Sequence, residues 1–297
     1  MLSPYRYRFI LAMLLASAMV MPQMSCDRHA PPNAPEVLKI HVLSSVYPLA
    51  SIAQQVGGPQ AEVEWFCENG QDPRDLRLSD EQTRHAHQAD LILTSGFREK
   101  WAGDTLEAHQ QAVRLLLPES TSTGRTLPDD HGALWLDPQV AREMAQLIAG
   151  RLTLLDAKHD QEYRQRADVF VKEADAVDAE FRARLAPFKG RKFLSLRTTW
   201  STLAQHYGLE EIAPINAEAH KLTDEDVRKL KDAALENKTD VLAIDAALLP
   251  GVQRELQQRT GLRLLPLDPL GSSAPDGRST WSRIMRYNLE QLVNGLR

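Results

Sequence analysis

A long amphipathic segment in the middle of the chain constrains the fold more than any other feature. Residues 159–186 carry apolar side chains at steps of three and four, which places them on one face of an α-helix. These side chains are Tyr163, Ala167, Phe170, Ala174, Val177 and Phe181. Pro187 and Gly190 end the pattern. At ~1.5 Å per residue, the segment predicts one continuous helix of roughly 40 Å, long enough to lie along two lobes.

Short apolar runs alternate with amphipathic segments on both sides of this helix. Each run has the length of a buried strand, and the alternation is typical of parallel sheets with helices on both faces. The predicted strands are 38–43, 61–66, 90–95, 192–196, 211–215, 240–244 and 262–267. We therefore expect an α/β fold of two lobes, whose parallel sheets are flanked by helices and joined by the long rigid helix. A ligand cleft is expected between the lobes, at the carboxyl ends of the strands.

The N-terminus has the features of a secretory signal. Arg6 and Arg8 precede an apolar run at 10–21, which is too short for a stable membrane anchor. Ser25 before Cys26 resembles a lipoprotein cleavage site, so we expect a signal peptide at 1–25 and a lipid on Cys26. Ordinary secretion with cleavage nearby is the alternative. The polar, proline-rich residues 26–37 are expected to form a flexible tether.

The remaining boundaries follow from the strand pattern and the long helix. We expect an N-terminal lobe at 38–157, a connecting helix at 158–188 and a C-terminal lobe at 189–297. The net charge of −5 is spread along the 297 residues, without a basic block suited to nucleic acid. The sequence also lacks a zinc-protease helix motif, a nucleophile elbow and a phosphate-binding glycine loop, so we do not expect an enzyme.

Six segments in order resemble the periplasmic binding proteins of zinc and manganese ABC importers. They read VLSSVYPLASIAQQVGG, NGQDPRDL, ADLILTSGFREKW, LWLDP, YGLEEIAPI and LDPLG, and the likeness extends over residues 38–297. The resemblance implies an extracytoplasmic solute-binding subunit that works with an ABC permease and its ATPase. It also implies a lipid-anchored location, periplasmic or at the cell surface, and a monomer.

The resemblance also implies four metal-ligand positions between the lobes, and this chain retains only one of them. The family's three histidine or glutamate positions fall on Arg74, Ala133 and Arg197, whereas the acidic position falls on Asp268. Zinc prefers imidazole and carboxylate ligands, and a guanidinium has no lone pair to offer. We therefore expect a degenerate metal site, and zinc or manganese binding rests on the resemblance alone.

Other side chains are possible substitute ligands near this cleft. They are His131, Cys67, His220 and Asp245. For each, a structural interpretation competes: His131 and His220 as exposed loop residues, Cys67 as a buried inert thiol, and Asp245 as a turn former. The ligand-chemistry interpretation is a cluster of Cys67, His131 and Asp268.

Two functions follow for the arginines. If Arg74 and Arg197 face Asp268, the cleft is net positive and suits an oxyanion or a metal held by an anionic chelator, besides a bare metal. Alternatively, the arginines pair with Asp268 and Asp245 and lock the lobes shut. The protein is then a non-transport scaffold or partner-binding module.

Overall fold

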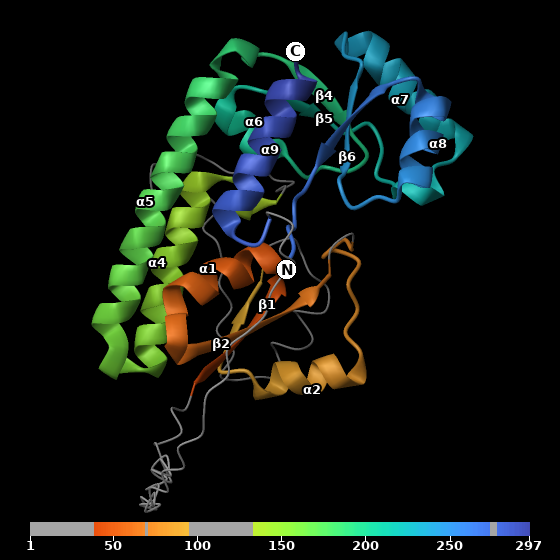
Figure 1. Cartoon of the computed structure of the whole chain (residues 1–297). Helices are drawn as coiled ribbons and strands as arrows, with labels where there is room; N and C mark the ends of the chain where they lie inside the picture. The colour runs from red at the N-terminus through yellow and green to blue at the C-terminus, as the bar shows by residue number, and fades with distance from the viewer. Residues whose placement is uncertain (1–38, 69–70, 95–132, 274–277) are drawn as a thin grey trace, which may run out of the picture. The chain divides into compact units, whose positions relative to one another are not determined.

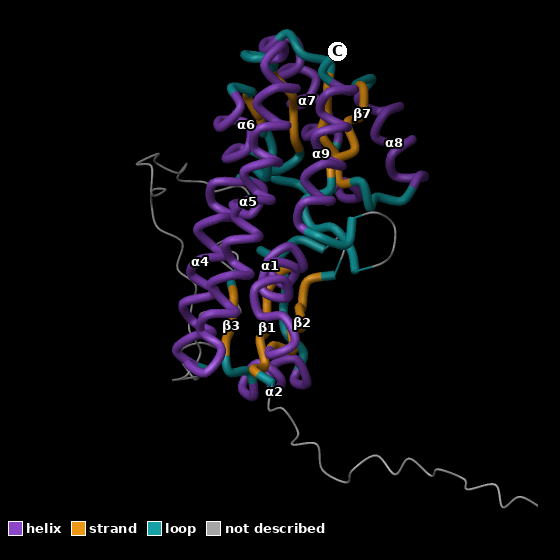
Figure 2. Tube along the Cα trace, turned by 60° about the vertical axis from the view of Figure 1, so that its left-hand side comes forward, coloured by secondary structure: helices purple, strands orange, loops and turns teal. Residues whose placement is uncertain are grey.

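The computed structural model describes residues 39–68, 71–94, 133–273 and 278–297. Residues 38–297 form one compact unit. Two separate parallel sheets lie within this unit, and Figures 1 and 2 show the helices around them. The predicted signal peptide, its cleavage site and the tether lie outside the described residues.

The first sheet has the strand order β2-β1-β3, and its strands are parallel. β1 (Ile40–Val46) is followed by α1 (Tyr47–Gly57) and the 3₁₀ turn η1 (Gly58–Gln60). β2 (Ala61–Cys67) leads through a loop to α2 (Asp80–Gln88) and then to β3 (Leu91–Leu93). β1 runs beyond the predicted end at residue 43, because Ser44 and Ser45 are buried in the strand although they are polar. The prediction from apolar residues alone therefore ended this strand too early.

The second sheet has the order β5-β4-β6-β7, again with parallel strands. The strands are β4 (Lys192–Ser195), β5 (Glu210–Ile212), β6 (Val241–Asp245) and β7 (Arg263–Leu267). The helices are α6 (Ser201–Tyr207), α7 (Asp224–Asn237), α8 (Pro250–Thr260) and α9 (Trp281–Gly295), with the 3₁₀ turn η5 (Ala219–Lys221). β5 ends earlier than predicted. Pro214 has no N–H to continue a ladder beyond Ile212.

Alternating side chains cover the two faces of each sheet, as strand geometry requires. In the second sheet, Leu194 and Leu242 pack with α7 and α8, whereas Phe193 and Val241 belong to the core shared with α6 and α9. In the first sheet, Leu43 packs with apolar residues of α2, and the other face contributes to the large core. Both sheets are therefore flanked by helices, as the sequence predicts.

The two halves are joined by a helical hairpin. The turn η2 (Leu134–Leu136) leads into α4 (Pro138–Leu155), and η3 (Ala157–His159) connects it to α5 (Asp160–Leu185). The six predicted stripe residues of α5 are all buried, together with Leu185. α5 contacts α4 and α1 as well as α6 and α9, so it packs on both halves (Figure 1). The turn η4 (Ala186–Phe188) ends it. This confirms the long connecting helix, while the lobe boundaries at 157 and 189 remain a prediction.

The C-terminal helix α9 also contacts both halves. It packs on β7 and α5 and touches α1. At its start, the Trp281 backbone N–H donates to the Ser51 hydroxyl at 3.0 Å, and the Trp281 indole donates to the Trp135 carbonyl at 2.7 Å. One hydrophobic core therefore runs from Ile40 to Leu296.

Candidate functional site

A cavity of about 490 Å³ lies where strands of both sheets end. Its lining comes from the loop after β2 and from the segments that follow β4, β6 and β7. The apolar part of the lining includes Leu76, Trp135, Leu196, Ile244, Leu248 and Leu270. The carboxyl ends of parallel strands are the usual ligand edge of open α/β sheets. The cavity is therefore at the place where the sequence predicts the cleft.

The loop after β2 is organised around the Asp72 carboxylate. Its Oδ1 accepts from the Arg74 backbone N–H at 2.9 Å, which closes a tight turn around Pro73. The Arg74 guanidinium then folds back onto the same carboxylate, through Nε at 2.9 Å and Nη2 at 2.7 Å. Although burial raises the pKa of Asp72, the hydrogen bonds from Arg74 and Arg197 hold it below its usual value.

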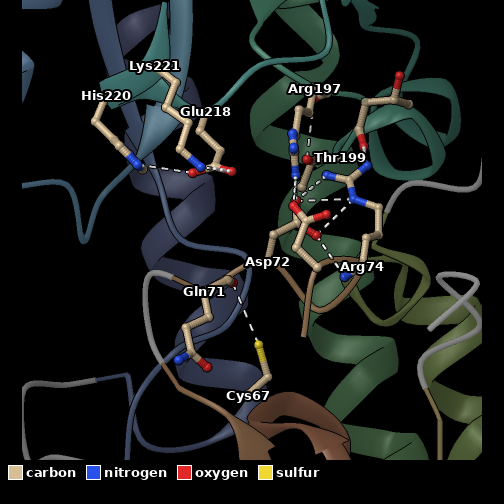
Figure 3. A network of polar contacts seen from close by, with 11 residues as sticks. Cys67, Gln71, Asp72, Arg74, Arg197, Thr199, Glu218, His220 and Lys221 are labelled. Carbon is tan, nitrogen blue, oxygen red and sulfur yellow. Dashed lines mark hydrogen bonds and ion pairs between the residues drawn. The ribbon is translucent and has the colours of Figure 1, made fainter. Parts of the chain in front are cut away.

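Contacts of two arginines connect this loop to the second half of the chain. Arg197 Nη1 lies 2.7 Å from Asp72 Oδ2 and 2.7 Å from Asp75 Oδ2. Arg74 Nη1 donates to the Thr198 carbonyl at 3.0 Å. Figure 3 shows Asp72 between the two arginines. We call this set of residues, Asp72, Arg74, Asp75 and Arg197, the arginine–aspartate network.

The segment after β4 is held by a carboxylate that carried no signal in the sequence, Glu211, and by the backbone of Ala133. The Glu211 carboxylate accepts from the backbone N–H groups of Thr199 and Trp200, each at 3.0 Å. Burial raises the pKa of Glu211. Ala133, where the resemblance leads us to expect a second ligand position, is buried, and its backbone N–H donates to the Thr199 carbonyl at 2.7 Å. Ala133 therefore lies at the site but offers it no ligand atom.

Asp268 lies directly after β7, but its carboxylate is already engaged. It is fully buried, and Oδ1 accepts from the backbone N–H groups of Leu270 at 3.0 Å and Gly271 at 2.7 Å. Its Oδ2 pairs with Arg278 Nη1 at 2.7 Å. The expected pairing of Arg74 and Arg197 with Asp268 and Asp245 is wrong, because the arginines bind acids of the β2 loop. Arg278 carried no signal in the sequence.

Asp245 ends β6 and lines the cavity. Its Oδ1 accepts from the Ala247 backbone N–H at 2.7 Å. Burial raises the pKa of Asp245 to about 6, and the negative charges of Asp268 and Asp72 act in the same direction. Its role as a turn former is therefore confirmed, and the residue also lines the cavity.

Of the other predicted substitutes, Cys67 and His220 form no metal-binding group with Asp268 in the described part of the chain. Cys67 is buried and its Sγ lies 3.6 Å from the Gln71 carbonyl oxygen, as the interpretation of a buried cysteine predicts. His220 lines the cavity, but its side chain is 58% exposed and pairs with Glu218 at 3.1 Å (Figure 3). His131 and the lipidation site Cys26 lie outside the described residues.

The donor set does not fit a zinc or manganese ion. Within the described ranges, no group of three or more histidine, cysteine, aspartate or glutamate side chains is placed to hold a metal. A structural or transport zinc site usually needs four such ligands. Arg74 and Arg197 supply fixed positive charge at two of the four family positions, and Arg278 neutralises the remaining acid.

The described cavity lining is close to neutral. It holds three arginines, Arg74, Arg77 and Arg197, against four carboxylates, Asp72, Asp75, Glu218 and Asp245. The expectation of a net positive cleft is therefore wrong, because the β2 loop brings its own acids to the arginines. A simple oxyanion is not favoured over other solutes by the charge of these residues.

Comparison with known proteins connects this arrangement to a family. The model of the family described as zinc-uptake complex component A, periplasmic, matches residues 42–295. The iron-binding protein YfeA of Yersinia pestis is 26% identical over 235 residues, covering 75% of each chain. The metal ABC transporter substrate-binding lipoprotein ScbA of Streptococcus cristatus is 21% identical over 312 residues, covering 97% of this chain and 98% of ScbA.

A solved structure with the same fold is that of the laminin-binding protein Lmb of Streptococcus agalactiae. Lmb is described as a bifunctional protein with adhesin and metal-transporting activity. The two structures align with a TM-score of 0.72 and 25% identity, over 87% of this chain and 100% of Lmb. The sequence-based expectation of a solute-binding component of metal ABC importers is thereby confirmed. The chain belongs to the family of the periplasmic zinc-uptake complex component A.

Proposed function

We propose that this member of the family captures a small organic solute, with metal chelates included, in place of a bare Zn²⁺ or Mn²⁺ ion. The observation that carries the proposal is the cavity of about 490 Å³ at the ligand edge of both sheets. This volume is within the range of ~300–1,000 Å³ that small-molecule sites occupy. A metal ion enclosed by four side chains needs far less space.

The residues around the cavity support an organic solute. Its lining combines leucine, isoleucine and tryptophan side chains with a few charged groups, which is the usual composition of small-molecule pockets. The former ligand positions no longer present lone pairs to a metal. The guanidinium groups of Arg74 and Arg197 have no lone pair to offer, and the Asp268 carboxylate already accepts from three donors.

The second candidate is a locked scaffold, and the arginine–aspartate network favours it. Each carboxylate of this network has an arginine partner, and Arg197 ties the β2 loop to the other half. The cavity argues against this candidate, because a locked cleft would be filled by side chains. The buried Nε of Arg197 also has no hydrogen-bond partner among the described residues, so the network is not fully satisfied.

The cellular role follows the family. We propose that the chain delivers its solute to an ABC permease and its ATPase, acts as a monomer, and is anchored by a lipid on Cys26 at the periplasmic or cell surface. None of the helices in the described ranges is long and apolar enough to cross a bilayer. We assign it a binding role without catalysis and without nucleic acid.

The proposal is tested on the full chain after secretion and purification. Native mass spectrometry should reveal a small molecule that leaves on denaturation, and calorimetry should show no stoichiometric binding of Zn²⁺ or Mn²⁺. A chain that carries no small molecule would favour the scaffold. Tight one-to-one zinc binding that His131→Ala or Cys67→Ala abolishes would overturn our interpretation of the metal site.

A further inference from the structure

The carboxylates that line the cavity differ in whether a cation neutralises them. Asp72 and Asp75 are bound by Arg197, and Glu218 lies 2.9 Å from Lys221 Nζ (Figure 3). The Asp245 carboxylate has no ion pair with a cation among the described residues, and it accepts a side-chain hydrogen bond from the Ala247 backbone N–H. It is thus the acid of the described lining whose charge the protein leaves uncompensated.

The surroundings of the Asp245 carboxylate favour the binding of a positively charged group of a ligand. Ile244 and Leu248 are its neighbours in the cavity wall, so water screens this carboxylate poorly. Asp268 and Asp72 add negative potential, and Arg278, the cation that opposes them, is engaged with Asp268. Burial is the main reason that its pKa rises to about 6, which reflects the cost of an unpaired charge at this place.

The cavity lining also includes Arg77, which has no ion pair in the described ranges. Its exposure to solvent differs from that of Asp245. Arg77 is exposed, so solvent and salt screen its charge. A ligand gains little by compensating a hydrated guanidinium at the surface. Compensating a partly buried carboxylate in an apolar wall contributes considerably more.

We infer that Asp245 anchors a positively charged nitrogen, an ammonium or guanidinium, of the captured solute. This inference rests on the proposed function and narrows its solute class to organic cations and to chelates or zwitterions with a protonated amine. The nitrogen would donate to Asp245 Oδ2, and the apolar part would lie against Leu248, Leu270 and Trp135 in the same cavity. A charged nitrogen that pairs with a carboxylate in such a wall forms a short, charge-assisted hydrogen bond.

The test uses probes of equal length that differ only in charge. These are 1,5-diaminopentane, 1,5-pentanediol and glutarate, titrated calorimetrically into the full chain, with agmatine as a guanidinium probe. The variants are Asp245→Asn and, as a matched control, Asp240→Asn, which lies just before the other end of β6 and outside this cavity. We expect both amines to bind the wild type and Asp240→Asn, and Asp245→Asn to bind them at least tenfold more weakly.

The pH dependence provides a second readout. Asp245 must be ionised to hold a cation, so amine affinity should fall about tenfold per pH unit below pH 6. The charged groups that influence Asp245 are Asp268, Asp72 and Arg278. In Asp245→Asn this dependence should disappear, whereas a merely structural role of Asp245 would leave it in place.

Several outcomes overturn the inference. They are binding of glutarate in preference to the amines, amine affinity unchanged in Asp245→Asn, and no amine binding at all. A co-purified solute whose retention Asp245→Asn does not alter refutes the anchor and leaves the proposed function intact. Stoichiometric zinc binding without any organic solute refutes both.

Discussion

Replacing Asp245 by asparagine should make the protein more stable near neutral pH and not near pH 4. In the wild type, the ionised carboxylate lies in the partly apolar wall of the cavity, and burial raises its pKa to about 6 from an ordinary 3.8. Asparagine has nearly the same shape and can still accept from the Ala247 N–H through its side-chain oxygen. The substitution therefore removes the titration and keeps the turn.

The magnitude and sign follow from this pKa difference. A rise of about two units corresponds to about 3 kcal/mol, because one unit corresponds to 1.36 kcal/mol. Between pH 3.8 and 6 the folded chain holds the Asp245 proton more tightly than the unfolded chain does. The contribution of Asp245 to the free energy of unfolding therefore falls by about 3 kcal/mol as pH rises through this window. The asparagine variant lacks that decline.

Urea unfolding of wild type and variant at several pH values between 4 and 8 measures this difference. The free energy of unfolding of Asp245→Asn minus that of the wild type should increase with pH and level off above pH 7. Asp240→Asn is the control, since the hydrogen bond from Arg263 lowers the pKa of Asp240, and its difference should stay flat over the same range. A flat difference for Asp245→Asn would refute the reasoning, and it would show that the carboxylate is well solvated.

Three further substitutions test the network and the core by urea unfolding. Arg197→Ala should cost about 1–3 kcal/mol, since it removes one of the two arginine partners of Asp72 and the arginine partner of Asp75, while Arg228→Ala, at exposed ion pairs, should cost much less. Equal costs would show that the network is unimportant. Phe170→Ala should cost about 3–5 kcal/mol, and its exposed neighbour Val169→Ala about 0.5 kcal/mol or less. A mild Phe170→Ala would contradict the buried stripe. Gly271→Ala should cost about 1–3 kcal/mol, because its φ is 66° and a Cβ would clash at 2.3 Å; an unchanged variant would argue against this loop geometry.

The sequence predicts the fold well because the spacing of hydrophobic residues, and the residues that end helices and strands, act locally. The stripe from Tyr163 to Phe181 is fixed by the 3.6-residue repeat, whatever it packs against, and the structure buries all six of its members. The strand boundaries are less predictable, because pairing decides them. Ser44 is buried in β1 through its register with Trp65, which no property of the serine itself indicates.

The site is harder to predict because its chemistry depends on partners distant in sequence. The positions of Arg74 and Arg197 relative to the cleft could be predicted, but their partners could not. Asp72 and Asp75 resemble ordinary loop aspartates, and their importance appears only when the chain brings Arg197 to them across more than a hundred residues. Arg278 is near Asp268 in sequence, yet the intervening residues give no periodic signal that would pair the two.

The charges at the positions where the resemblance places metal ligands are compensated by neighbouring side chains. Arg74 and Arg197 would repel each other if they were unbalanced, and the Asp72 carboxylate lies between them and accepts from both. Asp268 would be a buried unpaired acid without a metal, and Arg278 supplies the positive charge at 2.7 Å. Among the acids that line the cavity, Asp245 is therefore the one without a cationic partner in the described chain. A site that had merely lost its ligands would leave acids and cations unmatched throughout. A single unbalanced carboxylate that faces a cavity of about 490 Å³ is instead what a binding site for a cationic solute requires.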